Sequence, residues 1–236
     1  KGLKIGIFTD SEEIAHQLSE STEFLGNYYD FTRVGFVGCL KESSNFDKVW
    51  NELIALDILP IFLNSNSSLP FDRLSQLLSP FPKPELCLCQ RDLVNVEHLY
   101  PESLTNIYNV NCIAYQLPFS LRESYQSIHD MGFGTLRLGS LKSDITQVEP
   151  LLRHSDIFYL HTDSIQFSYF PAQKNPSPSG LTVDEVCKIV QYAGASDRMK
   201  GIIIQGLDPD LDIASQSSQL LGQLLWYIIE GVAMRK

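Results

Sequence analysis

Eight short runs of almost uninterrupted apolar residues constrain the fold of this chain more than any other feature. Each run has the length of a β-strand, and a run without polar alternation is typical of a strand buried on both faces of a sheet. The predicted strands are "LKIGIF" (3–8), "TRVGFVG" (32–38), "ILPIFL" (58–63), "ELCLC" (85–89), "YNVNCIAY" (108–115), "TLRLG" (135–139), "IFYL" (157–160) and "GIIIQ" (201–205).

Helical patterns separate these runs, with apolar residues at spacings of three and four. The predicted helices are Asp47–Ile54, Phe71–Leu78, Leu121–Met131, Asp144–Arg153 and a very apolar last helix over roughly Ser215–Ala233. Strands that alternate with helices predict an α/β fold, in which helices cover both faces of a mainly parallel sheet. The sequence has no linker, repeat or low-complexity segment, so we expect residues 1–236 to form a single domain.

The segment "LTVDEVCKIVQYAG" has the clearest helix signals in the chain. Thr182 and Glu185 have the spacing of a capping box, in which each side chain bonds the backbone of the other. Gly194 is predicted to end the helix, because glycine is the usual residue at a helix C-terminus.

Charge and composition exclude several classes of function. The formal net charge is −10 and no run of Lys or Arg interrupts it, so we expect no binding to nucleic acid. The apolar runs are too short to span a membrane. The five cysteines are scattered through apolar segments, which predicts reduced thiols in a cytoplasmic protein. Cys87 and Cys89 are interpreted as packing residues, although their spacing also occurs in metal and redox sites.

Polar side chains follow four of the predicted strands directly. Because ligands bind beyond the carboxyl ends of parallel strands, these ends would form one rim, which could hold a small polar or anionic molecule. Arg91 is the nearest basic side chain, and it could equally be a solvated loop residue. The predicted rim consists of Asn64, Ser65, Asn66, Ser67, Gln90, Asp92, His161, Asp163 and Asp208.

The C-terminal half contains short motifs in a characteristic order. They are "SPSGLT" followed by "DE", then "YAG" with "SD", and "DPDLD". In this order they resemble the arginase/ureohydrolase superfamily, and within it the bacterial formimidoylglutamase-like proteins. The resemblance implies a three-layer α/β/α sandwich around an eight-stranded parallel sheet. It also implies hydrolysis of non-peptide C–N bonds, in guanidino or formimino groups, by a water that bridges two Mn²⁺ ions.

The first two ligand motifs of that family can be carried over onto this sequence residue by residue. The family's "GGDHS" corresponds to "NSNSS", so Ser67 falls where a ligand histidine is expected. The family's "DAHTD" corresponds to "LCQRD". Here Leu88 replaces a bridging aspartate and Gln90 replaces a histidine, while Asp92 matches.

The third motif and the catalytic-site glutamate are altered as well. The family's "DVD" corresponds to "HTD", so that His161 replaces the second bridging aspartate and Asp163 matches. The catalytic-site glutamate falls on Gly206. Two dications held close together need bridging carboxylates, so the resemblance implies that the binuclear site is lost.

Two interpretations of function follow. The favoured one is a pseudoenzyme without a cofactor, which acts by binding or as an assembly partner. The alternative is an active C–N hydrolase with a single Zn or Mn ion at Asp92, His161 and Asp163, as in the related deacetylases, which use the same fold with one metal. His161 and Asp163 would share one face of an extended strand end. The resemblance also raises the hypothesis of a homo-oligomer, since family members often form oligomers.

Overall fold

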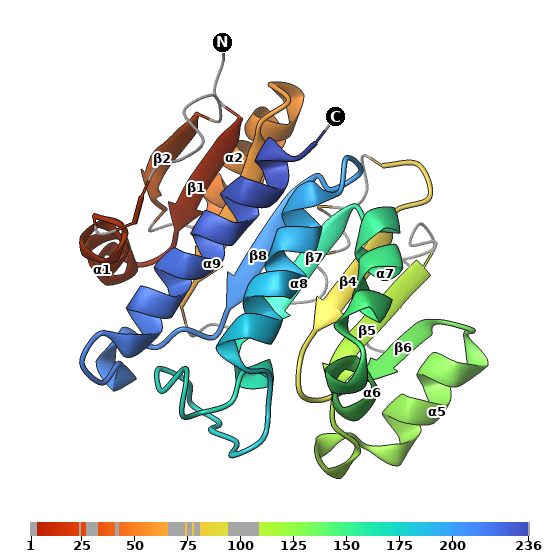
Figure 1. The fold of residues 1–236 in the computed structure, drawn as a ribbon. Helices are drawn as coiled ribbons and strands as arrows, with labels where there is room; N and C mark the ends of the chain where they lie inside the picture. The colour runs from red at the N-terminus through yellow and green to blue at the C-terminus, as the bar shows by residue number, and fades with distance from the viewer. Residues whose placement is uncertain are drawn as a thin grey trace.

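A computed structural model describes residues 4–23, 25–26, 33–40, 43–65, 74, 77, 81–93 and 109–235. Within these residues eight strands form one sheet in the order β2-β1-β3-β8-β7-β4-β5-β6, and every neighbouring pair is parallel (Figure 1). Each predicted apolar run overlaps one of them, so the α/β prediction is confirmed. The strands are β1 Ile5–Thr9, β2 Val34–Cys39, β3 Leu59–Asn64, β4 Glu85–Cys89, β5 Asn109–Tyr115, β6 Gly134–Arg137, β7 Ile157–His161 and β8 Gly201–Gln205.

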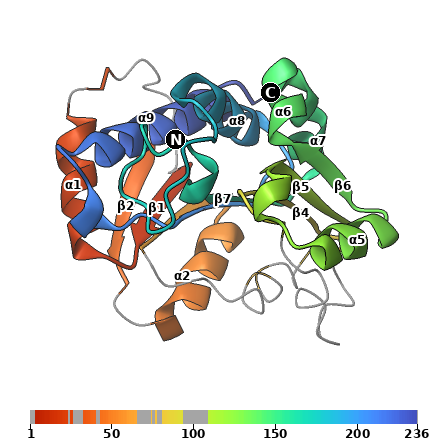
Figure 2. The same cartoon turned by 90° about the horizontal axis from the view of Figure 1, so that it is seen from below.

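Helices lie on both faces of the sheet, which gives three layers (Figure 2). Helices α1, α6, α7, α8 and α9 cover one face, and α2 and α5 lie on the other. Their bounds are α1 Glu12–Thr22, α2 Ser43–Ala55, α5 Arg122–Asp130, α6 Leu138–Ser143, α7 Val148–His154, α8 Val183–Ala195 and α9 Gln216–Ala233. None of the helices in the described part of the chain is both long and apolar enough to cross a membrane.

Each face of the sheet has its own hydrophobic core. On β7, Phe158 and Leu160 belong to the core under α8 and α9, whereas Ile157 and Tyr159 belong to the core that includes Trp50 of α2. Successive strand residues point to opposite faces, and both faces are covered here. This explains why the strands read as continuous apolar runs.

Two helix predictions were wrong in detail. The predicted helix Asp144–Arg153 starts as a 3-10 turn over Ile145–Gln147, which the Asp144 side chain caps by accepting from the backbone of Thr146, and it is α-helical only from Val148. The capping box of α8 is confirmed, but Gly194 lies inside that helix and does not end it. A β-carbon there would collide with the backbone of α9 at Ile228. The glycine therefore allows close helix packing. Of the predicted helix Phe71–Leu78, only Leu74 and Leu77 are described, and both are helical.

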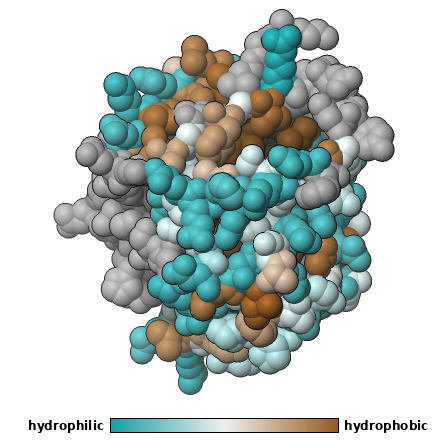
Figure 3. Space-filling view, turned by 90° about the vertical axis from the view of Figure 1, so that its left-hand side faces the viewer, coloured by the Kyte–Doolittle hydropathy of each residue, from teal (hydrophilic) through white to brown (hydrophobic). Residues whose placement is uncertain are grey.

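One edge of the sheet presents apolar side chains to solvent. On the edge strand β2, Val34 and Phe36 are exposed. Figure 3 views the molecule from the side of β1, β2 and α1, and hydrophobic atoms gather in its upper half above a hydrophilic belt. This edge is distant in the strand order from β7 and β4, whose carboxyl ends carry the predicted site.

Candidate functional site

The carboxyl ends of the central strands carry a row of polar residues. In the sheet register Asn64 of β3 pairs with Gln205 of β8, and Gln205 pairs with His161 of β7. The Asn64 amide donates a hydrogen bond to the Gln205 side-chain oxygen at 3.3 Å, and both residues are buried. Sequence analysis did not single out Gln205, although it ends an apolar run in the same way as Asn64 does.

A second missed residue, Asp10, lies directly after β1. Its carboxylate accepts hydrogen bonds from the backbone and the hydroxyl of Ser65, at 2.7 and 2.8 Å. The run "IFTD" has the same apolar-to-polar step as the predicted strand ends and could have been recognised by it. Asn66 and Ser67 lie outside the described residues. The Asp208 side chain caps its own turn by accepting from the backbone of Asp210.

His161 and Asp163 are in direct contact. Nδ1 of His161 lies 2.8 Å from Oδ1 of Asp163, and 3.3 Å from the Asp163 backbone nitrogen. The same Nδ1 atom cannot both donate a proton to Oδ1 and accept one from the backbone N–H of Asp163. Two bare acceptors would repel at the shorter distance, so we assign the proton to Nδ1, which donates to the carboxylate. The contact depends on a 3-10 turn, η4 (Thr162–Ser164), and not on the extended backbone that sequence analysis assumed.

Arg91 lies among the carboxylates of this site. Its guanidinium donates to Asp92 through Nε at 2.7 Å and through Nη2 at 3.3 Å, and Nη2 forms an ion pair with Asp163 at 3.9 Å. Nη1 donates to the carbonyl oxygen of Asn175 at 2.8 Å, and the group stacks on the ring of Phe119. Arg91 is only 8% exposed, so of the two alternatives left open for it, that of a solvated loop residue is wrong.

The electrostatics of Arg91 follow from these contacts. Its hydrogen bond to Asp92 raises the pKa of the guanidinium, and the negative charges of Asp92 and Asp163 add to this effect against the opposing effect of burial. The backbone N–H of Arg91 also donates to Asp163 at 3.4 Å. Arg91 therefore holds a permanent positive charge between two carboxylates.

Two further family positions, Leu88 and Gln90, carry uncharged side chains. Leu88 is fully buried in the core on the α2 side, where it pairs in register with Cys112 and Tyr159. The Gln90 amide donates to the backbone carbonyl of Asp92 at 2.7 Å. The structure thus brings His161 and Asp163 together, and joins Asp92 to Asp163 through Arg91.

Gly206 leaves room for the His161 ring. Its φ is +94°, a conformation that favours glycine. A β-carbon there would lie 2.9 Å from Cε1 of His161 and 2.7 Å from the hydroxyl of Thr162. That hydroxyl donates to the Gly206 carbonyl oxygen at 2.8 Å. Any side chain at position 206 would therefore have to displace the imidazole.

Cys87 and Cys89 pack as sequence analysis predicted. Both are fully buried in the core under α8 and α9. Burial raises the pKa of Cys89 to about 12 and that of Cys87 well above its usual value. Thiols of this kind stay protonated and are poor metal ligands and nucleophiles. Across the described ranges, no three or more His, Cys, Asp or Glu side chains are grouped so that they could hold a metal ion.

The "SPSGLT" motif holds the loop after β7 in place. Leu181 and Ser164 are joined by a backbone hydrogen bond of 2.8 Å, and Gln166 donates back to Leu181 at 3.0 Å. A β-carbon at Gly180 would lie 2.5 Å from the Gln166 nitrogen and 2.8 Å from the Ser164 oxygen. The glycine is required because the two backbone segments approach so closely.

Gly180→Ala is therefore expected to destabilise the protein by about 2 kcal/mol, since backbone atoms cannot move aside cheaply. The matched control is Gly139→Ala in α6, where a β-carbon meets open space. That change is expected to stabilise by about 0.5 kcal/mol, because alanine favours helix. Urea midpoints at equal m-values measure both effects. Equal midpoints for the two variants would contradict the close approach.

Comparisons with known proteins agree with this architecture. No protein-family model matches the chain. Over 118 residues it is 25% identical to formimidoylglutamase of Bacillus subtilis, a match that spans 48% of this chain and 37% of that relative. A solved structure of Trypanosoma cruzi formiminoglutamase with Mn²⁺ superposes with a TM-score of 0.86 at 13% identity, covering 99% of this chain and 95% of the other.

Two further solved structures have the same fold. Formimidoylglutamase of Bacillus subtilis gives a TM-score of 0.80 at 13% identity, over 100% of this chain and 89% of the other. Agmatine ureohydrolase of Thermoplasma volcanium gives 0.78 at 16% identity, over 97% and 89%. The resemblance inferred from the sequence is confirmed: the chain has the fold of the arginase superfamily, and about half of it is similar in sequence to a bacterial formimidoylglutamase.

Proposed function

We propose that this protein is a non-catalytic homologue of the arginase and formimidoylglutamase family that no longer holds two manganese ions and acts by binding or assembly. The observation that carries the proposal is the position of Arg91. Its guanidinium already supplies the positive charge that the carboxylates of Asp92 and Asp163 require. A dication at the same carboxylates would meet this buried cation, and like charges at such distances repel strongly.

The donor set supports the same conclusion. Two metal ions about 3.5–4 Å apart need several carboxylates that bridge them. Leu88 offers no ligand atom and its side chain is part of the core, while the Gln90 amide is bonded to a backbone carbonyl. These residues do not fit a binuclear manganese site.

One observation favours the alternative of a C–N hydrolase with a single metal. With its proton on Nδ1 and Asp163 behind it, His161 keeps a free lone pair on Nε2, and its side chain is 27% exposed. A histidine oriented by a carboxylate in this way is a common metal ligand and a common general base. Asp163 would then be a positioning residue.

Metal content separates the two functions. The protein is purified with Mn²⁺ and Zn²⁺ supplied, its metals are measured by elemental analysis, and hydrolysis of formimidoylglutamate and agmatine is assayed. We expect well under one ion per chain and no hydrolysis above background. Asp163→Asn is compared with Asp208→Asn, whose side chain caps a separate turn. A stoichiometric metal that is lost only in Asp163→Asn would overturn the pseudoenzyme proposal and support the single-metal alternative.

A further inference from the structure

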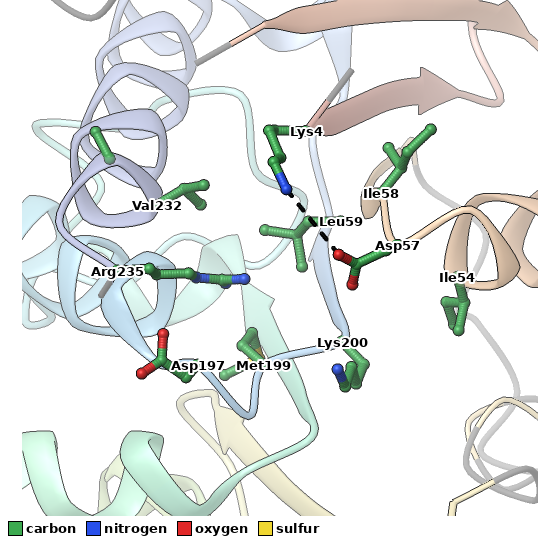
Figure 4. A pocket seen from close by; sticks show the side chains of 11 residues that line it. Lys4, Ile54, Asp57, Ile58, Leu59, Asp197, Met199, Lys200, Val232 and Arg235 are labelled. Carbon is green, nitrogen blue, oxygen red and sulfur yellow. Dashed lines mark ion pairs between the residues drawn. The ribbon is translucent and has the colours of Figure 1, made fainter. Parts of the chain in front are cut away.

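A cavity of about 430 Å³ opens at the amino-terminal edge of the sheet, opposite to the rim described above (Figure 4). Its walls come from residues just before β1 and β8, from the start of β3, from the end of α2 and from the last turn of α9 and the residues after it. Cavities of this size hold small organic molecules. Because the cavity and the rim lie at opposite ends of the strands, a ligand here would not touch Arg91 or His161.

Arg235 extends into this cavity in Figure 4, toward Lys4 and Met199. Its Nε donates to the carbonyl oxygen of Gly194 at 2.7 Å, which fixes the guanidinium at the end of α8. Its Nη2 is buried and has no hydrogen-bond partner in the part of the chain that the structure describes. An unpartnered buried donor is costly, and such groups call for an explanation such as a missing ligand.

The guanidinium is poorly compensated where it lies. Burial lowers the pKa of Arg235, and the negative charges of Asp197 and Asp57 offset only part of this effect. The Lys4–Asp57 ion pair is long, at 4.0 Å, and both side chains are well exposed. Such a pair is weak, so Lys4 can turn toward another anion at little cost.

The charges of the lining determine which anion fits. Lys4, Lys200 and Arg235 face Asp57 and Asp197, so three cations and two carboxylates leave a formal charge of +1. One carboxylate would neutralise the cavity, whereas a phosphate dianion would leave excess negative charge beside the two aspartates. Leu59, Met199 and Val232 supply an apolar wall.

We propose that this cavity binds a small organic monocarboxylate with an aliphatic or aromatic body. The carboxylate pairs with the guanidinium of Arg235, whose planar shape suits it, and Lys4 or Lys200 assists from the cavity mouth. The body lies against Leu59, Met199 and Val232. The site is independent of the proposed function and would exist whether or not the rim binds a metal.

The first probe is 4-phenylbutyrate, titrated by calorimetry, with 4-phenylbutyramide and phenyl phosphate as comparison ligands. We expect the acid to bind, and the amide and the phosphate to bind at least about tenfold more weakly. The amide has no negative charge, and the phosphate dianion has one more than the cavity can neutralise. Failure of the acid to bind at concentrations up to about 10 mM would overturn the proposal.

Variants locate the site. Arg235→Gln is expected to weaken 4-phenylbutyrate binding at least about tenfold. Arg153→Gln, on the exposed face of α7, should leave binding unchanged. Lys200→Gln is a second variant at an exposed side chain, so it should fold in any case, and it should weaken binding a few-fold. Undiminished binding to Arg235→Gln, or equal losses in Arg235→Gln and Arg153→Gln, would show that the acid binds elsewhere.

Discussion

Replacing Leu88 by aspartate is expected to destabilise this protein by about 5 kcal/mol or more. The motif alignment nevertheless places an aspartate of the arginase family at this position. Leu88 is fully buried among Tyr159, Cys112 and other apolar side chains of the core on the α2 side. The change removes buried apolar volume and introduces a carboxylate with no described cation beside it. The core at this position is built for leucine.

Three substitutions at this position separate the causes. Leu88→Ala measures the loss of packing, expected at about 3 kcal/mol. Leu88→Asn adds polarity, and Leu88→Asp adds charge at the same size. Denaturant unfolding gives the free energy of each variant. The difference in unfolding free energy between Leu88→Asp and Leu88→Asn is the contribution of the charge.

The dependence on pH checks this assignment. Burial raises the pKa of an introduced carboxyl group above its value in the unfolded chain. The folded state then binds more protons than the unfolded state, so the destabilisation of Leu88→Asp should shrink as the pH falls through that raised pKa. The Leu88→Asn cost should not change. If Leu88→Asp folds at neutral pH and is stabilised by Mn²⁺, position 88 faces a metal site and the proposed function fails.

The strands could be predicted from the sequence because their environment is uniform. Runs such as "ELCLC" and "GIIIQ" match β4 and β8 residue for residue, since both faces of the sheet are covered and the inner residues of these two strands are all apolar. Helix α6 was not predicted. Its first residues, Leu138 and Gly139, were assigned to the strand "TLRLG", because the apolar run continues past the end of β6 at Arg137.

The contacts of the candidate site could be predicted from the sequence only in part. His161 and Asp163 are two residues apart, so their contact is a local property of the sequence. Arg91 is different, because Phe119, Asp163 and Asn175 all lie far from it along the chain. Nothing in "QRD" distinguishes a solvated arginine from one fixed by three distant segments. Only the fold brings those segments together.

Arg91→Met is expected to destabilise the protein by about 3 kcal/mol. The change keeps much of the side-chain volume but leaves Asp163, which is buried, without its guanidinium partner, and breaking one side of a buried ion pair is costly. Asp92 contributes less, since its side chain is 46% exposed and water can replace the arginine. The matched control is Arg153→Met, whose partner Glu149 lies one helical turn away on an exposed face. That change should cost no more than about 0.5 kcal/mol.

A double-mutant cycle with Asp163→Asn tests whether the cost arises at this pair. If Arg91 serves to neutralise Asp163, the two changes together should cost less than their sum, with a coupling of about 1–2 kcal/mol. Additive costs would mean that Arg91 acts mainly through Asn175 and Phe119, and the carboxylates would then be open to another cation. Strong coupling would mean that the chain supplies its own cation at Asp163, which is the condition under which the fold can persist without a metal.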